Sequence, residues 1–144
     1  TEGGGVSYDP ENHEKMSQLR AEKVNGIAKS YDPIAVQGEK EGDLLVIGWG
    51  GTYGVIFSAT KALQDEGFAV SSIHLRHLNP LPSDLETLLS SFKKVIVPEL
   101  NLGQLSTILK AKYVRDIISF NKLQGKPFKV AELREEFVKH LSSK

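Results

Sequence analysis

The chain contains 144 residues in which 18 Lys and Arg residues balance 18 Asp and Glu residues, and it has no cysteine. This length fits one domain with a core of ordinary size, and the balanced charge gives no overall field that would attract nucleic acid. The absence of cysteine excludes disulfides, Cys-ligated zinc and iron–sulfur clusters on this chain. No apolar run approaches the roughly 20 residues of a membrane span, and the start of the chain has no signal-peptide pattern. We therefore expect a cytoplasmic protein with neither a membrane nor a nucleic-acid partner.

Residues 1–30 are expected to form a mobile lead-in and a connecting helix rather than part of the core. Residues 1–7 are polar and glycine-rich, which predicts a mobile lead-in that resembles the cut edge of something longer. Asp9 followed by Pro10 favours the start of a helix that continues to about Lys29. The apolar side of this helix is thin and consists of Met16, Leu19, Val24 and Ile27. Such a side suits either a helix that lies against another domain or a solvated connector.

An apolar run at residues 44–47 leads into a glycine-rich turn at residues 48–54. The run predicts a strand buried on both faces, as in a parallel sheet covered by helices. Glycine allows positive φ or a close backbone approach, and the turn has Gly48, Gly50, Gly51 and Gly54. From Val55 to Glu66 the apolar residues recur at helical spacing, and Gly67 is placed to end that helix.

The same alternation is expected along the rest of the chain. Further strands are predicted at 34–36, 70–75, 95–97 and 117–120, followed by a loop at 121–127. Helices are predicted from a capping box at Ser83 to Glu86, from Asn101 as an N-cap, and from about Val130. Their inward residues are expected to be Leu85, Leu88, Leu89 and Phe92, then Leu105, Ile108 and Leu109, then Leu133, Phe137 and Leu141.

Strands that alternate with helices imply right-handed crossovers and therefore an α/β fold, with three layers (α/β/α) around a mainly parallel sheet. We place this domain at residues 31–144. In such a sheet, ligands bind beyond the carboxyl ends of the strands. The groups expected at these ends are the glycine turn, Arg76, His77, Glu99, Asn101, Asn121 and Lys122.

The glycine turn resembles a loosened dinucleotide fingerprint, in which backbone N–H groups at a helix N-terminus hold a pyrophosphate. The acidic residue expected about 20 residues later is missing, and His74, Arg76 and His77 instead end a strand, where they could suit a 2′-phosphate. A free-standing Rossmann-like NADP-binding domain is therefore one hypothesis. The other is a purely structural turn, because such glycines are needed without a ligand and Trp49 and Tyr53 would crowd a phosphate.

No residue is assigned a catalytic or metal-binding role. Glu99 could act as a general acid or base, but a carboxylate just before a helix more often satisfies backbone donors and the helix dipole. Thr52 does not stand in the Gly-x-Ser-x-Gly frame of a hydrolase. The four histidines show no metal-ligand spacing, and they are His13, His74, His77 and His140.

Several separate motifs occur at residues 7–13, 19–24, 48–54, 77–82, 98–105 and 118–128. Together they resemble the C-terminal part of the α subunit of 2-oxoacid:ferredoxin oxidoreductases, the 2-oxoglutarate type in particular. The resemblance implies a transketolase C-terminal-domain-like fold within a thiamine diphosphate enzyme. Such an enzyme decarboxylates a 2-oxoacid, passes electrons through iron–sulfur clusters to ferredoxin and leaves the acyl group on coenzyme A.

The resemblance also implies where the chemistry lies. The thiamine pyrimidine belongs to an earlier α-subunit domain, and the diphosphate, magnesium and clusters belong to the β subunit. It implies no cofactor on this chain, and it implies the β subunit and the remaining α-subunit domains as partners. We expect an excised or separately built domain that is inactive in isolation, and the sequence does not identify the 2-oxoacid.

In that setting the strand ends are expected to face the neighbouring domain or a second protomer. A large ring beside glycines makes a compact interface anchor. The expected interface residues are Trp49, Thr52, Tyr53, Arg76, His77, Asn101 and Lys122. Arg76 and His77 could instead reach the substrate pocket or the carboxylate of an acidic cosubstrate.

Overall fold

The computed structural model describes residues 33–78, 81–100, 104–113, 115–122 and 126–141. The helix expected at residues 9–29 and the capping role of Asn101 lie outside the described residues. The domain division at residue 30 therefore stays a prediction.

The described residues alternate between strands and helices, as the sequence predicted. In chain order the elements are β1 (Val36–Gln37), β2 (Gly42–Trp49), the 3-10 turn η1 (Gly50–Thr52), α2 (Tyr53–Asp65), β3 (Val70–Leu75), α3 (Leu85–Ser90), β4 (Phe92–Leu100), α4 (Gln104–Tyr113), β5 (Ile118–Lys122) and α5 (Val130–Leu141).

The described strands form one sheet in the order β1-β3-β2-β4-β5. β2 lies in the middle and is parallel to both neighbours, with Leu45 opposite Ser71 of β3 and Val95 of β4. β5 continues the parallel arrangement beside β4, whereas β1 is a short antiparallel edge strand beside β3. The expected mainly parallel sheet is confirmed.

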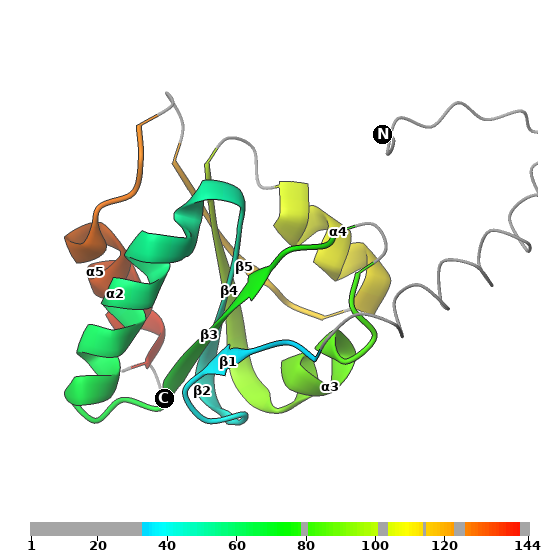
Figure 1. The fold of residues 1–144 in the computed structure, drawn as a ribbon, viewed down its shortest axis with the longest axis horizontal. Coiled ribbons are helices and arrows are strands. Elements are labelled where there is room, and N and C mark those ends of the chain that lie inside the picture. The colour runs from blue at the N-terminus through cyan, green and yellow to red at the C-terminus, as the bar shows by residue number, and fades with distance from the viewer. Residues whose placement is uncertain (1–32, 79–80, 101–103, 114, 123–125, 142–144) are drawn as a thin grey trace, which may run out of the picture.

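The side-chain alternation of β2 divides the core into two layers. Leu45 and Ile47 face a cluster that contains the buried apolar residues of α3 and α4. Leu44 and Val46 face the opposite cluster, which contains the buried apolar residues of α2 and α5. Figure 1 shows the same arrangement, with α2 and α5 on one side of the sheet and α3 and α4 on the other. The expected three-layer α/β/α architecture is therefore confirmed.

The helix that follows β2 ends as the sequence indicated. α2 ends at Asp65 with Glu66 as its C-cap, and Gly67 follows with a φ of 96°. The N–H of Gly67 donates to the carbonyl of Gln64 at 3.0 Å, so the left-handed glycine closes the helix.

Several expected boundaries were wrong. Phe92 was expected on a helix, but α3 ends at Ser90 and Phe92 begins β4, because it pairs with Gly42 of β2. The capping box at Ser83 was wrong as well: the N-cap of α3 is Asp84, whose carboxylate accepts the backbone N–H of Ile34 at 2.9 Å instead of capping the helix.

Two other expectations failed at the surface and at the sheet edge. Ile108 was expected inward, but it is 44% exposed, while Leu105 and Leu109 of the same helix are fully buried. The strand expected at 117–120 runs instead from Ile118 to Lys122, because pairing with β4 extends to Lys122.

Among the described residues, no helix combines the length and the apolar character needed to cross a bilayer.

The two faces of the core give a first prediction. Phe137 of α5 is fully buried. Phe137→Ala should therefore lower the free energy of unfolding by about 3–5 kcal/mol, through lost burial and an unfilled cavity. Ile108→Ala, made on an exposed helix face, is the matched control and should stay within about 0.5 kcal/mol of the wild type. Urea unfolding measures both, and equal losses in the two variants would contradict the assigned core.

Candidate functional site

The connections of the sheet reverse direction between β2 and β4. β2 leads through α2 to β3 on one side, whereas β4 leads through α4 to β5 on the other. α2 and α4 cover opposite faces of the sheet (Figure 1). Ligands of open α/β sheets bind at the carboxyl ends of strands at such a switch point. Trp49 at the end of β2 and Glu99 near the end of β4 stand there.

Glu99 closes this switch point with its own side chain. The carboxylate is 1% exposed and accepts the indole N–H of Trp49 on Oε1 at 3.1 Å. It also accepts the backbone N–H groups of Leu105 on Oε1 at 2.7 Å and of Ser106 on Oε2 at 3.0 Å, in the first turn of α4. The helix N-terminus, where an external anion would bind, is thus occupied by a carboxylate of the chain itself.

This arrangement favours the structural interpretation of Glu99 over general acid–base catalysis. The sequence predicted that a carboxylate before a helix would satisfy backbone donors, and the bonds to Leu105 and Ser106 agree with that interpretation. The partnership with Trp49 was missed, because the two residues lie 50 positions apart in the chain. Only the parallel pairing of β2 and β4 brings them together.

The glycine turn has a structural reason at two of its positions. Gly50 adopts a φ of 66°, and a Cβ on Gly48 would lie 2.6 Å from Cδ1 of Ile56, so α2 packs closely over the strand. Gly51 and Gly54 border open space. Thr52 is buried and donates its hydroxyl to the carbonyl of Trp49 at 3.0 Å, which fixes the turn. The chain therefore remains sterically open at Gly51 of η1 and at Gly54 in the first turn of α2.

A second feature lies at the edge of the sheet. A groove of about 460 Å³, called here the edge groove, is bounded by β1 with the residues before it, by the carboxyl end of β3 and by the start of α2. Tyr53, Arg76 and His77 of the expected interface line it. Phe57 and Gln37 also line it, and the sequence reasoning missed both. The signal for Phe57 was its spacing of four residues from Tyr53 on one helix face.

His74 lines the edge groove. The ring of Tyr53 packs edge-on against its imidazole, with 5.2 Å between the ring centroids. Burial, and secondarily the positive charge of Arg76, lower the pKa of His74 below its ordinary value of 6.5. Within the described residues, its Nδ1 is buried and has no hydrogen-bond partner. The groove therefore holds a neutral imidazole beside a guanidinium at pH 7.

Lys122 belongs to the far edge of the sheet. Its ammonium donates to Glu132 of α5 at 2.6 Å and to the carbonyl of Pro127 at 3.0 Å. The hydrogen bond from Lys122 to Glu132 is the largest cause that lowers the pKa of Glu132. The bond from the backbone N–H of Lys129 is the second. Asn121 accepts the hydroxyl of Ser119 at 2.8 Å. β4 and β2 separate β5 from β3, so Lys122 does not join Arg76 in one site.

The expected interface residues thus fall into separate groups. Trp49 and Thr52 support the switch point, Tyr53, Arg76 and His77 line the edge groove, and Lys122 ties β5 to α5. Asn101 and His13 lie outside the described residues. Among the residues that the structure describes, no group of three His, Cys, Asp or Glu side chains could hold a metal ion.

No family model matches the chain. The 2-oxoglutarate oxidoreductase subunit KorA of Mycobacterium tuberculosis is 42% identical over 132 residues, which cover 90% of this chain and 20% of that protein. A solved 2-oxoglutarate:ferredoxin oxidoreductase from Magnetococcus marinus, with 2-oxoglutarate, coenzyme A and succinyl-CoA bound, superposes with a TM-score of 0.81 at 34% identity. That match covers 96% of this chain and 25% of the other.

A split-gene transketolase shares the fold. It superposes with a TM-score of 0.58 at 17% sequence identity, and the match covers 78% of this chain and 44% of the other. These comparisons define an open, mainly parallel α/β domain of the kind found in oxidoreductases and transketolases. The sequence is similar to those of α subunits of 2-oxoacid:ferredoxin oxidoreductases, as its motifs indicated. It spans only about a fifth of the length of the M. tuberculosis relative.

The bonds of Glu99 give the second prediction. Each oxygen of the Glu99 carboxylate accepts at least one N–H group. In Glu99→Gln an NH2 group replaces one of these oxygens, so it must face an N–H donor that has lost its acceptor. The substitution should lower the free energy of unfolding by about 1–3 kcal/mol, because a buried donor loses its acceptor. Trp49 is the single tryptophan of the chain, so its fluorescence reports unfolding and the local change together.

Glu39→Gln, at an exposed position, is the matched control and should leave both stability and tryptophan emission unchanged. Unaltered stability and emission in Glu99→Gln would show that the buried carboxylate does not hold β2, β4 and α4 together.

The depressed pKa of His74 gives the third prediction. Since the folded chain disfavours the imidazolium, the unfolded chain binds the proton more readily as the pH falls through 6.5. The stability that the neutral imidazole contributes is therefore present above that value and lost below it. The wild type should lose stability relative to His74→Asn from about pH 7 downward, measured by urea unfolding at several pH values.

Arg76→Ala separates the two causes of this shift. Burial is the larger cause, so Arg76→Ala should keep most of the pH dependence. Parallel stability curves for the wild type and His74→Asn across this range would contradict the assignment.

Proposed function

We propose that this chain is the non-catalytic C-terminal domain of the α subunit of a 2-oxoacid:ferredoxin oxidoreductase, with 2-oxoglutarate as the substrate of the intact enzyme. In this role it supports the assembly of domains and subunits for oxidative decarboxylation of a 2-oxoacid to an acyl-CoA. The homology over most of the chain supports this proposal, as does the small share of the relatives that the chain covers.

The observation that carries the non-catalytic assignment is the use of Glu99. The carboxylate at the switch point is committed to Trp49 and to the first turn of α4, so the position at which related folds bind ligands serves to hold the domain together. At 1% exposure, the Glu99 carboxylate presents almost no surface to a reacting atom.

The cofactors of the proposed enzyme belong to its other parts. Thiamine diphosphate and magnesium would supply carbanion chemistry, iron–sulfur clusters would carry electrons to ferredoxin, and coenzyme A would take the acyl group. Glu99 already occupies the N–H groups at the start of α4, so that helix N-terminus does not offer them to a phosphate of these groups. The proposed partners are the β subunit and the remaining α-subunit domains, with ferredoxin reached through the complex.

One observation favours a second candidate function. Gly51 of η1 and Gly54 in the first turn of α2 border open space, and Arg76 lines the neighbouring edge groove. A free-standing NADP-binding domain would use these two features for the pyrophosphate and the 2′-phosphate.

Calorimetric titration of the chain with NADPH and with thiamine diphosphate separates the two functions. We expect no heat of binding with either compound, and no turnover of 2-oxoglutarate by the chain alone. The chain should instead associate with a complex of the β subunit and the rest of the α subunit. Tight NADPH binding would favour the second candidate, and turnover by the isolated chain would refute the non-catalytic assignment.

A further inference from the structure

The edge groove has an exposed apolar wall on α2. Tyr53 and Phe57 lie one helical turn apart with 5.9 Å between their ring centroids, and they are 54% and 42% exposed. Both residues line the groove, but a small ligand enclosed in it would leave their outer ring faces in water. Two large apolar side chains that lie together at the surface indicate a site that another segment of protein covers.

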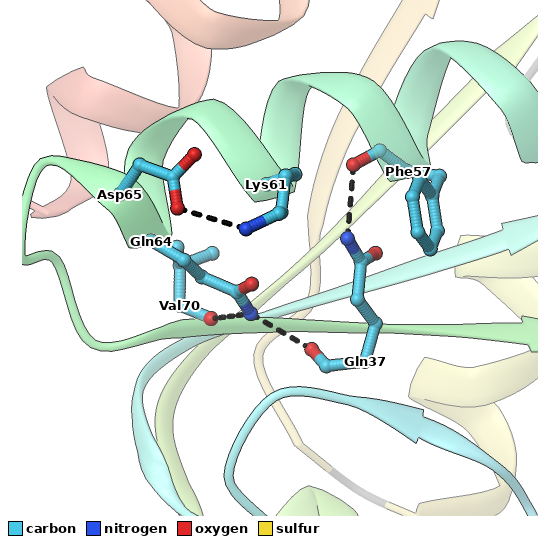
Figure 2. Close-up of polar contacts among 6 residues, drawn as sticks. All are labelled: Gln37, Phe57, Lys61, Gln64, Asp65 and Val70. Atoms are coloured by element: carbon cyan, nitrogen blue, oxygen red, sulfur yellow. Dashed lines mark hydrogen bonds and ion pairs between the residues drawn. The ribbon is translucent and has the colours of Figure 1, made fainter.

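The walls of the groove are held in place by amide side chains. Figure 2 shows Gln37 of β1 donating to the carbonyl of Phe57, while Gln64 of α2 donates to the carbonyls of Gln37 and Val70, each at 2.9 Å. These bonds fix β1 against α2 from both directions. The groove is therefore preformed, and a segment that covers it does not have to order it first.

The chain itself enters the described part of the domain at this groove. The described residues begin at Pro33, and Pro33, Ile34 and Ala35 all line the groove. Tyr31 stands two residues before Pro33, so its Cα lies within about 7 Å of that of Pro33. A segment tethered so closely has an effective concentration on the order of millimolar at the groove, which favours it over any separate molecule.

The sequence before Pro33 contains an apolar face of suitable length. Val24, Ile27, Ala28 and Tyr31 recur at the spacing of one helix face. Eight residues of helix are about 12 Å long, which is enough to cover two rings that lie one turn apart. Gly26 weakens the intrinsic helix preference of this segment, so its order depends on a surface against which it can pack.

The charges of the segment and the groove are complementary. Residues 1–32 contain six Asp and Glu residues against four Lys and Arg residues. None of the residues lining the groove is Asp or Glu, and Arg76 lines it with an exposed side chain. The segment therefore approaches the groove with charge of the opposite sign.

We propose that residues 24–31 fold back onto the domain and cover the edge groove, with the apolar face of this segment packed against Tyr53 and Phe57. The edge groove is then an interface within the chain, and it fixes the direction in which the preceding residues leave the domain. This inference goes beyond the proposed function and does not depend on it, because both surfaces belong to this chain.

Hydrogen–deuterium exchange of the full chain, followed by mass spectrometry, tests the proposal. In the wild type, the amides of residues 24–31 should exchange about tenfold or more slowly than those of an unstructured peptide of the same sequence. Phe57→Ala removes part of the surface that the segment covers. This variant should speed exchange over residues 24–31 by about fivefold or more.

Ile108→Ala is the matched control. Ile108 is 44% exposed, close to the 42% of Phe57, and it lies on α4 on the opposite face of the sheet (Figure 1). This truncation should leave exchange over residues 24–31 within about twofold of the wild type. Unchanged slow exchange of β2 in each variant establishes that the domain is folded.

Ile27→Ala tests the segment from its own side. Alanine is the best helix former, so any faster exchange in this variant does not come from a lost helix preference. Ile27→Ala should speed exchange over residues 24–31 as Phe57→Ala does. Because both changes disrupt the same contact, the double variant should exchange less rapidly than the product of the two single effects predicts.

The remaining outcomes overturn the proposal. Fast exchange over residues 24–31 in the wild type, or equally slow exchange in Phe57→Ala, would show that the segment does not cover the groove. Protection that grows with the concentration of the chain would make a second copy the occupant. Protection that appears only with the β subunit and the rest of the α subunit would assign the groove to a partner, while the proposed function would stand.

Discussion

The carboxylate of Glu99 is held almost completely out of water, and the closed edge of the sheet depends on it. A buried carboxylate is costly unless its oxygens accept hydrogen bonds, and Glu99 accepts them from Trp49 and from the first turn of α4. The same contacts satisfy helix donors that would otherwise lack partners. One side chain therefore joins β2, β4 and α4 at the point where the chain connections reverse.

Because Glu99 occupies the switch point, the accessible groove of the domain lies at the sheet edge instead. β1 is a short antiparallel strand, and its few pairs with β3 leave the carboxyl end of β3 beside an open groove. α2 supplies the other wall because Gly48 allows it to pack closely over β2. The groove, with its guanidinium and aromatic rings, is thus a product of how these elements meet, while the switch point itself is filled.

The homology and this geometry agree with an architectural part in a larger enzyme. The chain matches a small share of its oxidoreductase relatives but does so over nearly all of its own length. Tyr53, Phe57 and Arg76 line the edge groove. Lys122 differs from them because an ion pair with Glu132 already uses its charge.

The sequence by itself determined the order of the elements and indicated the resemblance to the oxidoreductase relatives. The run at residues 44–47, the helical spacing after Val55 and the left-handed Gly67 each reflect neighbouring residues, so a local pattern suffices to predict them. Only the tertiary structure decided that Ile108 is exposed and that Glu99 has Trp49 as a partner. Both outcomes depend on contacts between segments distant in the chain, which a local pattern does not contain.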